Sequence, residues 1–387
     1  MRPGKEKQKK KVFVGLSGGV DSSVSAALLK KGGFDVTGVF IKVWQPDFLP
    51  LARARGAGGC TWKEDRLDAM RVAAHLDIPF ITLDLEKEYK KEVVDYMIAE
   101  YKKGKTPNPD VMCNQHVKFG AFFKKAVAAG ADFVATGHYA RVAFGDRGLT
   151  QTKRGLTRKK SVSEYKLLAG VDRGKDQSYF LWTLTQKELS KTLFPVGEYK
   201  KGEVRKLAEK FGLPTAQKKD SQGLCFMGRL DMKDFLQHFI RGKNGDVIDT
   251  SGEVLGSHHG AVFLTLGERH GFTITKKGTN DMPYYVVAKD IKKNTITVSH
   301  EPLSKDQDGV GKNASLSSVN WIMGAPPVIG KSYASRLRYR QPLEKCEIIF
   351  IGNDRTEVGF KKEQLASPGQ SLVLYDGDEC LGGGIIE

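Results

Sequence analysis

The chain is poor in cysteine and in long apolar runs. Its 387 residues contain five cysteines and no Cys-x-x-Cys pair: Cys60, Cys113, Cys225, Cys346 and Cys380. An odd number of widely spaced cysteines excludes a disulfide scaffold and argues against a structural zinc site, so a reducing, cytoplasmic compartment is expected. No apolar run approaches the roughly 20 residues that span a bilayer, so no membrane-spanning segment and no partner within a membrane are expected.

Acidic residues are scarce relative to basic ones. The chain has 45 Asp and Glu against 62 Lys and Arg, a formal net charge of +17. This excess favours a polyanionic partner, but it does not choose between RNA, DNA and a membrane surface. Hydrophobic residues make up 40% and charged residues 28%, which is typical of a globular chain. At roughly 150 residues per domain, the length predicts two or three domains.

The first half of the sequence alternates strand and helix patterns. Strands are predicted over 12–16, 35–44, 79–85 and 132–136, and helices over 22–31, 64–76, 86–103 and 117–129. Such alternation is typical of a parallel α/β sheet covered by helices on both faces. Functional sites in these sheets lie at the carboxyl ends of the strands.

The second half changes in character. Helical periodicity largely ends after Ile240, and short β-rich runs separated by Gly, Asn and Asp follow. This pattern predicts one or two small β domains, of a barrel type. The basic segment 145–163 is expected to be a connection, and residues 51–59 a surface insertion. His258, His259 and His270 lack the spacing of a metal-ligand set, so no metal site is predicted.

The segment from Gly15 to Ser23, GLSGGVDSS, follows a predicted strand and opens a predicted helix. Adjacent glycines let backbone N–H groups approach an anion, and the helix N-terminus and the serine hydroxyls add donors. The turn lacks the Walker lysine and the third glycine of the dinucleotide fingerprint. We therefore predict a pyrophosphate cradle; the alternative is a plain glycine turn with an Asp or Ser cap.

This segment resembles the SGGxDS motif of the PP-loop ATP pyrophosphatase superfamily. Members cleave ATP between the α- and β-phosphates and adenylate a substrate oxygen, which a nucleophile then displaces. The resemblance implies ATP with Mg²⁺, and Asp21 would help to hold the metal on the departing pyrophosphate.

Two cysteines have unusual surroundings. Cys113 lies in NPDVMCN, between a proline-rich loop and a predicted helix start, where a helix dipole can lower a thiol pKa. Asp110 lies three residues before it. Cys225 lies in DSQGLCF, a polar loop that contains a glycine. Each alone could be an ordinary buried cysteine, and we interpret Cys60, Cys346 and Cys380 in that way.

Six motifs, in order along nearly the whole chain, resemble those of the tRNA-specific 2-thiouridylases. They are NPDxxCN…KFG (108–120), ATGHYAR (135–141), KDQSYFL (175–181), DSxGLCF (220–226), RYRQ (338–341) and CLGGGII (380–386). The family replaces O2 of the wobble uridine of tRNAs for Lys, Glu and Gln with sulfur. The resemblance implies a PP-loop domain over 1–225, a small central tRNA-binding domain over 226–290 and a C-terminal β-barrel-like domain over 291–387.

The resemblance also implies roles for individual residues. Cys225 would carry the incoming sulfur as a transient persulfide, Cys113 would release it and leave a Cys113–Cys225 disulfide, and Asp110 would be a general acid or base. The residues implied in ATP binding are Gly15, Leu16, Ser17, Gly18, Gly19, Val20, Asp21, Ser22, Ile41 and Gly137. Those implied in tRNA binding are Asn108, Pro109, Asp110, His138, Lys175, Asp176, Gln177, Tyr339, Arg340 and Gln370.

Some features depart from the family pattern or leave choices open. Ile41 stands where the family has Met, so a backbone contact is expected there, and the insertion over 51–59 has no counterpart. The sulfur donor is either a relay protein or a cysteine desulfurase. One rival function is an amidotransferase or ligase of the same superfamily, which would need neither two cysteines nor a charge of +17. Another is a non-catalytic RNA-binding protein, which predicts a broken glycine-rich turn, whereas Asp21 and both glycines are intact.

Overall fold

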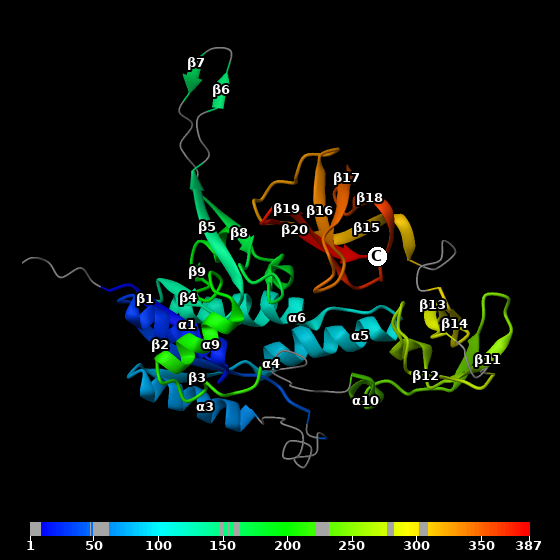
Figure 1. Ribbon diagram of the computed structural model, residues 1–387, viewed down its shortest axis with the longest axis horizontal. Helices are drawn as coiled ribbons and strands as arrows, with labels where there is room; N and C mark the ends of the chain where they lie inside the picture. The colour runs from blue at the N-terminus through cyan, green and yellow to red at the C-terminus, as the bar shows by residue number, and fades with distance from the viewer. Residues whose placement is uncertain are drawn as a thin grey trace, which may run out of the picture.

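A computed structural model describes residues 9–46, 48, 62–146, 150–152, 155–157, 163–220, 232–276, 282–301 and 309–387. They form three parts, each with its own sheet (Figure 1). This is the α/β architecture with two following β domains that the sequence predicts. No helix in these ranges is long and apolar enough to cross a membrane.

The first part contains a parallel five-stranded sheet in the order β3-β2-β1-β4-β9. Its strands are β1 (Lys11–Gly15), β2 (Asp35–Lys42), β3 (Phe80–Asp84), β4 (Phe133–Ala135) and β9 (Thr192–Leu193). The main helices around it are α1 (Val20–Lys31), α3 (Trp62–His75), α9 (Lys201–Lys210) and the two long helices described next. Val12 and Val14 of β1 are fully buried, as expected for a central strand of such a sheet.

The two long helices contain π-helical turns. The helix predicted over 86–103 is present as α4 (Glu86–Tyr89), π-helix η1 (Lys90–Asp95) and α5 (Tyr96–Lys102). The next comprises α6 (Pro109–Met112), π-helix η2 (Cys113–Phe122) and α7 (Phe123–Ala128). It begins at Pro109, eight residues before the predicted start, because proline suits the first helical position and Asn108 caps the helix.

Between β4 and β9 the chain forms a β-hairpin and several short elements. It holds β5 (Ala140–Asp146), β6 (Thr150–Thr152), β7 (Gly155–Thr157), β8 (Ser163–Ala169), 3₁₀ helix η3 (Ser178–Leu181) and α8 (Gln186–Leu189). β5 and β8 pair antiparallel from Ala140 opposite Ala169 to Asp146 opposite Ser163. The expected connection over 145–163 is therefore the outer part of a β-hairpin, as far as its residues are described.

The central part begins with α10 (Met232–Gln237) and has a five-stranded sheet in the order β12-β11-β10-β14-β13. Its strands are β10 (Gly245–Ile248), β11 (Val254–His258), β12 (Phe272–Ile274), β13 (Tyr285–Asp290) and β14 (Thr295–Ser299), with 3₁₀ helix η4 (Ala261–Phe263) between β11 and β12.

The C-terminal part is a closed ring of six strands. They are β15 (Val310–Trp321), β16 (Ser332–Arg336), β17 (Glu344–Ile351), β18 (Thr356–Leu365), β19 (Ser371–Asp376) and β20 (Glu379–Ile386). Pairing runs β15-β18-β17-β16-β19-β20, and β20 pairs back to β15. β8 also pairs with β20, so the β5–β8 hairpin extends the sheet of the barrel. The side chains of Tyr179, Trp182 and Tyr375 are almost fully buried in a core that the first and last parts share.

Candidate active site

The glycine-rich turn joins the carboxyl end of β1 to the N-terminus of α1. Gly18 has φ +73°, and a Cβ there would lie 2.2 Å from the carbonyl oxygen of Asp65 on α3, so only glycine fits. The Ser22 hydroxyl accepts a hydrogen bond from the Ser17 amide at 3.2 Å, and the Ser23 hydroxyl donates to the Gly19 carbonyl at 2.7 Å. These contacts fix the turn in a shape that suits an anion at a helix N-terminus.

The residues expected to bind ATP come together at one edge of the sheet. Gly15 ends β1, and Ile41, 4% exposed, lies near the end of the adjacent β2. Gly137 follows β4 on the other side of β1, and a Cβ there would lie 2.7 Å from the Ser22 amide nitrogen. The loop after β4 thus presses directly on the start of α1. A Cβ at Gly18 or at Gly137 would meet backbone atoms at these distances, so the turn, with its N–H groups at the start of α1, admits no side chain at either position.

Asp21 lies in the first turn of α1 and belongs to a network of charged groups. Its Oδ1 accepts hydrogen bonds from the Tyr139 hydroxyl at 2.8 Å and from Lys201 Nζ at 2.6 Å. Burial, followed by the nearby Asp21 carboxylate, raises the pKa of Tyr139 well above its usual range. Tyr139 therefore stays protonated and donates to Asp21.

Lys201 links Asp21 to a second carboxylate. Its Nζ lies 3.0 Å from Asp220, which also pairs with Lys175 at 2.9 Å and with Arg205. Burial raises the pKa of Asp220, but the bonds to Lys175 and Lys201 outweigh it and hold that pKa far below its usual range. Asp220 therefore remains ionised and anchors the described chain five residues before Cys225.

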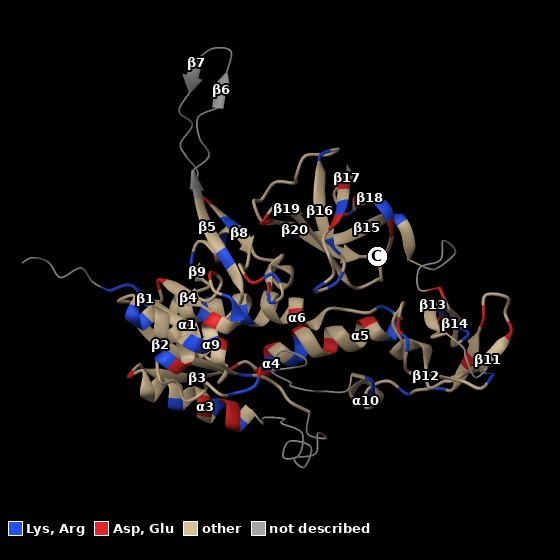
Figure 2. Ribbon diagram, viewed as in Figure 1, with Lys and Arg blue, Asp and Glu red and all other residues tan. Residues whose placement is uncertain are grey.

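Lys201 and Arg205 are site residues that the sequence motifs do not predict individually. They belong to the basic run 200–206, and their i, i+4 spacing on one helix face was the available signal. On α9 and the neighbouring α1, basic and acidic segments lie close together (Figure 2). Asp21, the partner of Lys201, is 180 residues away along the chain, so local pattern could not reveal that pairing.

The NPDxxC motif forms the start of the helix α6–η2. The Asn108 side chain accepts a hydrogen bond from the Val111 amide at 3.3 Å, Pro109 occupies the first helical position, and Asp110 lies in the first turn. Cys113 begins the π-helical stretch and is completely buried. π-Helical turns often occur at functional sites because they alter the direction of side chains.

His138 follows Gly137 and is buried, whereas a direct contact with tRNA would need an exposed ring. It is 7% exposed, its Nδ1 is 2.6 Å from the Thr136 hydroxyl, and its Nε2 is 3.4 Å from Lys118 Nζ. Because an ammonium can only donate, Nε2 accepts and Nδ1–H donates to Thr136. Burial, and then the Lys118 charge, lower the pKa of His138 well below its usual value, so the ring is neutral.

Residues 175–177 support the site through contacts with its charged residues and with the barrel. Lys175 holds Asp220, and the Gln177 side chain accepts a hydrogen bond from the Tyr139 amide at 3.0 Å. Asp176 is 2% exposed and pairs with Arg336 of the barrel at 3.0 Å. Two of these residues thus have partners in the cradle region, and one joins the first part to the barrel.

The expected tRNA-binding residues of the C-terminal part face the same region from the other side. Tyr339 packs on Phe180, with ring centroids 4.5 Å apart, and the Arg340 guanidinium lies 5.2 Å from the Tyr339 ring centroid. Gln370 Nε2 donates to the Thr106 carbonyl at 2.7 Å, just before the NPDxxC motif. The structure thus places Tyr339 against η3 and Gln370 against the segment that leads into α6, although the sequence separates each pair by more than 150 positions.

The cysteines have different positions. Cys225 lies outside the described residues, as do Cys60 and the insertion over 51–59, so the relation of Cys225 to Cys113 is not described. Cys346 and Cys380 are buried, as expected for ordinary core cysteines, and burial raises the pKa of both thiols. Among the described residues, no three His, Cys, Asp or Glu side chains are grouped as a metal site would require.

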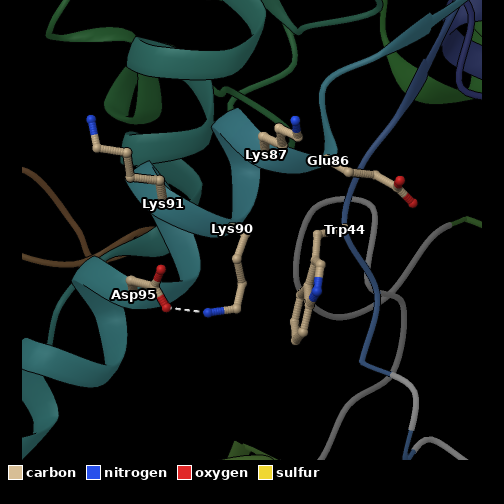
Figure 3. A pocket seen from close by; sticks show the side chains of 6 residues that line it. All are labelled: Trp44, Glu86, Lys87, Lys90, Lys91 and Asp95. Carbon is tan, nitrogen blue, oxygen red and sulfur yellow. Dashed lines mark hydrogen bonds and ion pairs between the residues drawn. The ribbon is translucent and has the colours of Figure 1, made fainter.

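A separate cavity of about 410 Å³ lies beyond the end of β2 (Figure 3). Its lining is Trp44, Glu86, Lys87, Lys90, Lys91 and Asp95. Lys90 lies 5.4 Å from the Trp44 ring centroid and pairs with Asp95, and Lys91 pairs with Glu92 at 2.9 Å. Glu86 and Asp95 offset most of the charge of its three lysines, so the lining carries only a small net positive charge.

The chain matches three protein-domain families over most of its length. Residues 10–229 match the family described as tRNA methyl transferase HUP domain, 233–300 the tRNA methyl transferase PRC-barrel domain, and 312–386 the aminomethyltransferase beta-barrel domain. These three ranges correspond to the three parts of the fold.

Curated relatives match nearly the whole chain. A protein of Streptococcus thermophilus named tRNA-specific 2-thiouridylase MnmA is 42% identical over 99% of this chain and 96% of its own length. A protein of Geobacillus thermodenitrificans with the same name is 42% identical over 97% and 94%. Among solved structures, NMN synthetase from Francisella tularensis reaches a TM-score of 0.30 at 16% identity over 55% of this chain and 66% of its own, too low to carry an argument.

Proposed function

Because the chain belongs to the family of the tRNA-specific 2-thiouridylases, which are tRNA-uridine 2-sulfurtransferases, we propose that it makes 2-thiouridine at the wobble position of tRNAs for Lys, Glu and Gln. The observation that carries this proposal is the cradle at the carboxyl ends of β2, β1 and β4, in a chain 42% identical to such enzymes over almost its full length.

The first proposed step activates the uridine. O2 of the base attacks the α-phosphorus of ATP, pyrophosphate leaves, and C2 then carries AMP as a leaving group. The cradle from Gly15 to Ser22, with Ile41 and Gly137, would hold the nucleotide. Mg²⁺ bound with ATP would neutralise charge on the pyrophosphate; the carboxylate of Asp21 and the hydroxyls of Ser17 and Ser22 are the oxygen ligands it prefers. Lys201, already beside Asp21, offers a further positive charge there.

The second proposed step transfers sulfur. Cys225 carries a persulfide received from a donor protein, and its terminal sulfur attacks C2 while AMP departs. The Cys113 thiolate then attacks the Cys225 sulfur, which breaks the sulfur–sulfur bond, leaves the outer sulfur on C2 and forms a Cys113–Cys225 disulfide. A reductant must reopen this disulfide before the next turnover. Asp110, one helical turn before Cys113, would move the proton at the base.

The third element is tRNA binding. Asn108, Pro109 and Asp110 would face the target base, and the net charge of +17 would attract the phosphate backbone. The other tRNA contacts that the family resemblance implies are His138, Lys175, Asp176, Gln177, Tyr339, Arg340 and Gln370. Because His138 and Asp176 are buried here, they would reach tRNA only after their surroundings rearrange, whereas Arg340 and Tyr339 lie at the edge of the barrel.

AMP release measured with and without tRNA, together with mass spectrometry of the tRNA nucleosides, tests the proposal. We expect release that depends on tRNA with a wobble uridine, and 2-thiouridine when a persulfide donor is present. An amidotransferase or ligase would release AMP with another substrate, and a non-catalytic RNA-binding protein would release none. Either result would refute the proposal.

A further inference from the structure

The segment that leads into the NPDxxC motif is the place where all three parts of the molecule meet. Residues 103–107 connect α5 to α6 within the first part. Thr106 donates its amide hydrogen to the Pro368 carbonyl at 2.8 Å and accepts from Gln370 Nε2 at 2.7 Å. Its hydroxyl donates to the Thr265 hydroxyl of the central part at 3.2 Å.

The central part holds the same segment two residues earlier. Lys289, on β13, donates from Nζ to the Gly104 carbonyl at 2.8 Å and to the Leu264 carbonyl at 2.6 Å. Burial lowers the pKa of Lys289 to about 8, against a weaker opposing effect of Glu268. An ammonium that gives up hydration for two carbonyls is a costly arrangement, and this indicates a specific positioning contact rather than a surface charge.

Packing leaves this junction little freedom. Gly369 has φ +90°, and a Cβ there would lie 3.0 Å from the backbone nitrogen, carbon and oxygen of Thr106. A Cβ at Gly104 would lie 2.5 Å from the Ile291 side chain of the central part. The Gly369 amide is itself bonded to the Ile386 carbonyl of β20 at 2.8 Å, so the turn 367–370 is fixed to the barrel.

The junction lies close to the proposed chemistry. Thr106 precedes Asp110 by four residues, and two of the intervening residues are Pro107 and Pro109, whose φ angles are fixed by their rings. A displacement at Thr106 therefore moves the start of α6 rather than being absorbed by the connection. A misplacement of about 1 Å in a reacting group can lower a rate roughly 100-fold.

We propose that Gln370 and Lys289 are positioning residues, which hold Thr106 and Gly104 and so make the placement of Asp110 and Cys113 depend on the barrel and the central part. The inference rests on the proposed function. It gives Gln370 a role through the protein backbone, in contrast to the direct tRNA contact that the family resemblance implies. RNA bound across the two β domains would thus act on the catalytic helix through four hydrogen bonds.

The test uses Gln370→Leu and Lys289→Met, with Lys292→Met as the matched control. Lys292 is exposed and lies in the turn after β13, so its substitution removes the same charge without touching the junction. We measure kcat for tRNA-dependent AMP release, Kd for tRNA, and amide hydrogen exchange of peptides covering residues 104–113. Hydrogen exchange is measured because the Thr106 amide donates to the Pro368 carbonyl of the barrel, so its exchange rate reports on this contact.

We expect both junction variants to lower kcat by about 10- to 100-fold, with tRNA Kd changed by less than about twofold, and faster exchange over 104–113. The control should match the wild type. If Gln370→Leu instead raises Kd and leaves kcat unchanged, Gln370 is a direct RNA contact and the inference is wrong. Unchanged kcat in Lys289→Met, or an equal loss in Lys292→Met, also overturns it.

Thermal unfolding of the variants and AMP release by the wild type distinguish a failure to fold, a failure of the proposed function and a failure of the positioning role. Thermal unfolding shows whether Lys289→Met folds; if it does not, the half-buried Gln370 side chain carries the test alone. Wild-type enzyme that releases no AMP with tRNA refutes the proposed function itself, whereas active wild type with unaffected variants refutes only the positioning role.

Discussion

Substitution of Gly18 by alanine tests the phosphate cradle most directly. Gly18 has φ +73°, a conformation that costs an L-residue about 1 to 2 kcal/mol. The new Cβ would also lie 2.2 Å from the Asp65 carbonyl oxygen, whereas ordinary contacts begin at 3.4 Å. The turn and α3 must therefore separate by about 1 Å, which moves the backbone N–H groups that would face the phosphates.

Gly33→Ala is a matched control at the other end of the same helix. Gly33 has φ +83°, so alanine there meets the same backbone strain, but no atom lies within 4 Å of the added Cβ. Backbone strain should lower the unfolding free energy of both variants by about 1 to 2 kcal/mol in denaturant titration, and the contact with Asp65 should lower that of Gly18→Ala further. Only Gly18→Ala should lose activity, because only it displaces the cradle.

The assay is ATP-dependent AMP release with saturating tRNA. We expect Gly18→Ala to fall about 100-fold, equivalent to about 2.7 kcal/mol of transition-state stabilisation, and Gly33→Ala to stay within about twofold of the wild type. A Gly18→Ala enzyme as active as Gly33→Ala would show that the turn does not hold the nucleotide, and the assignment of the whole edge of the sheet would fail.

Three other outcomes are expected. Asp21→Ala should abolish AMP release while tRNA binding, measured by filter retention, stays nearly intact; normal release would remove Asp21 from the metal site. Cys225→Ser should fail to accept labelled sulfur from a persulfide donor, whereas Cys113→Ser should accept it without passing it to tRNA, and both should still release AMP; wild-type thiolation by Cys225→Ser with such a donor would contradict the mechanism. Folding lowers the pKa of His138, so near and below its ordinary pKa of 6.5 the unfolded state binds more protons than the folded state. The free energy of unfolding should therefore decline as pH falls from 7.5 to 5.5, and His138→Gln should make that decline less steep. Equal pH dependence in the two proteins would show that the folded state does not hold His138 neutral.

Local pattern predicts the elements of the first part well because each depends on neighbouring residues. The segment 12–16 alternates buried and partly buried residues and forms β1, and the helix after it ends where Gly33 adopts a left-handed conformation. The cradle follows from the same stretch, since its glycines and serines are consecutive. The strand order β3-β2-β1-β4-β9 could not be predicted in this way, because it depends on which apolar surfaces pack together.

Contacts between distant segments explain what sequence reasoning missed. The sequence predicts only a polar connection at the outer part of the β5–β8 hairpin, because local residues do not indicate strands there. The hairpin is held by pairing with β20, more than 200 residues away, in which Cys380 lies opposite Leu167. The same holds for Asp176, which a motif marks as functional but which is buried against Arg336. A motif identifies residues that a family keeps together; only the fold shows whether such a residue faces the substrate or supports another residue that does.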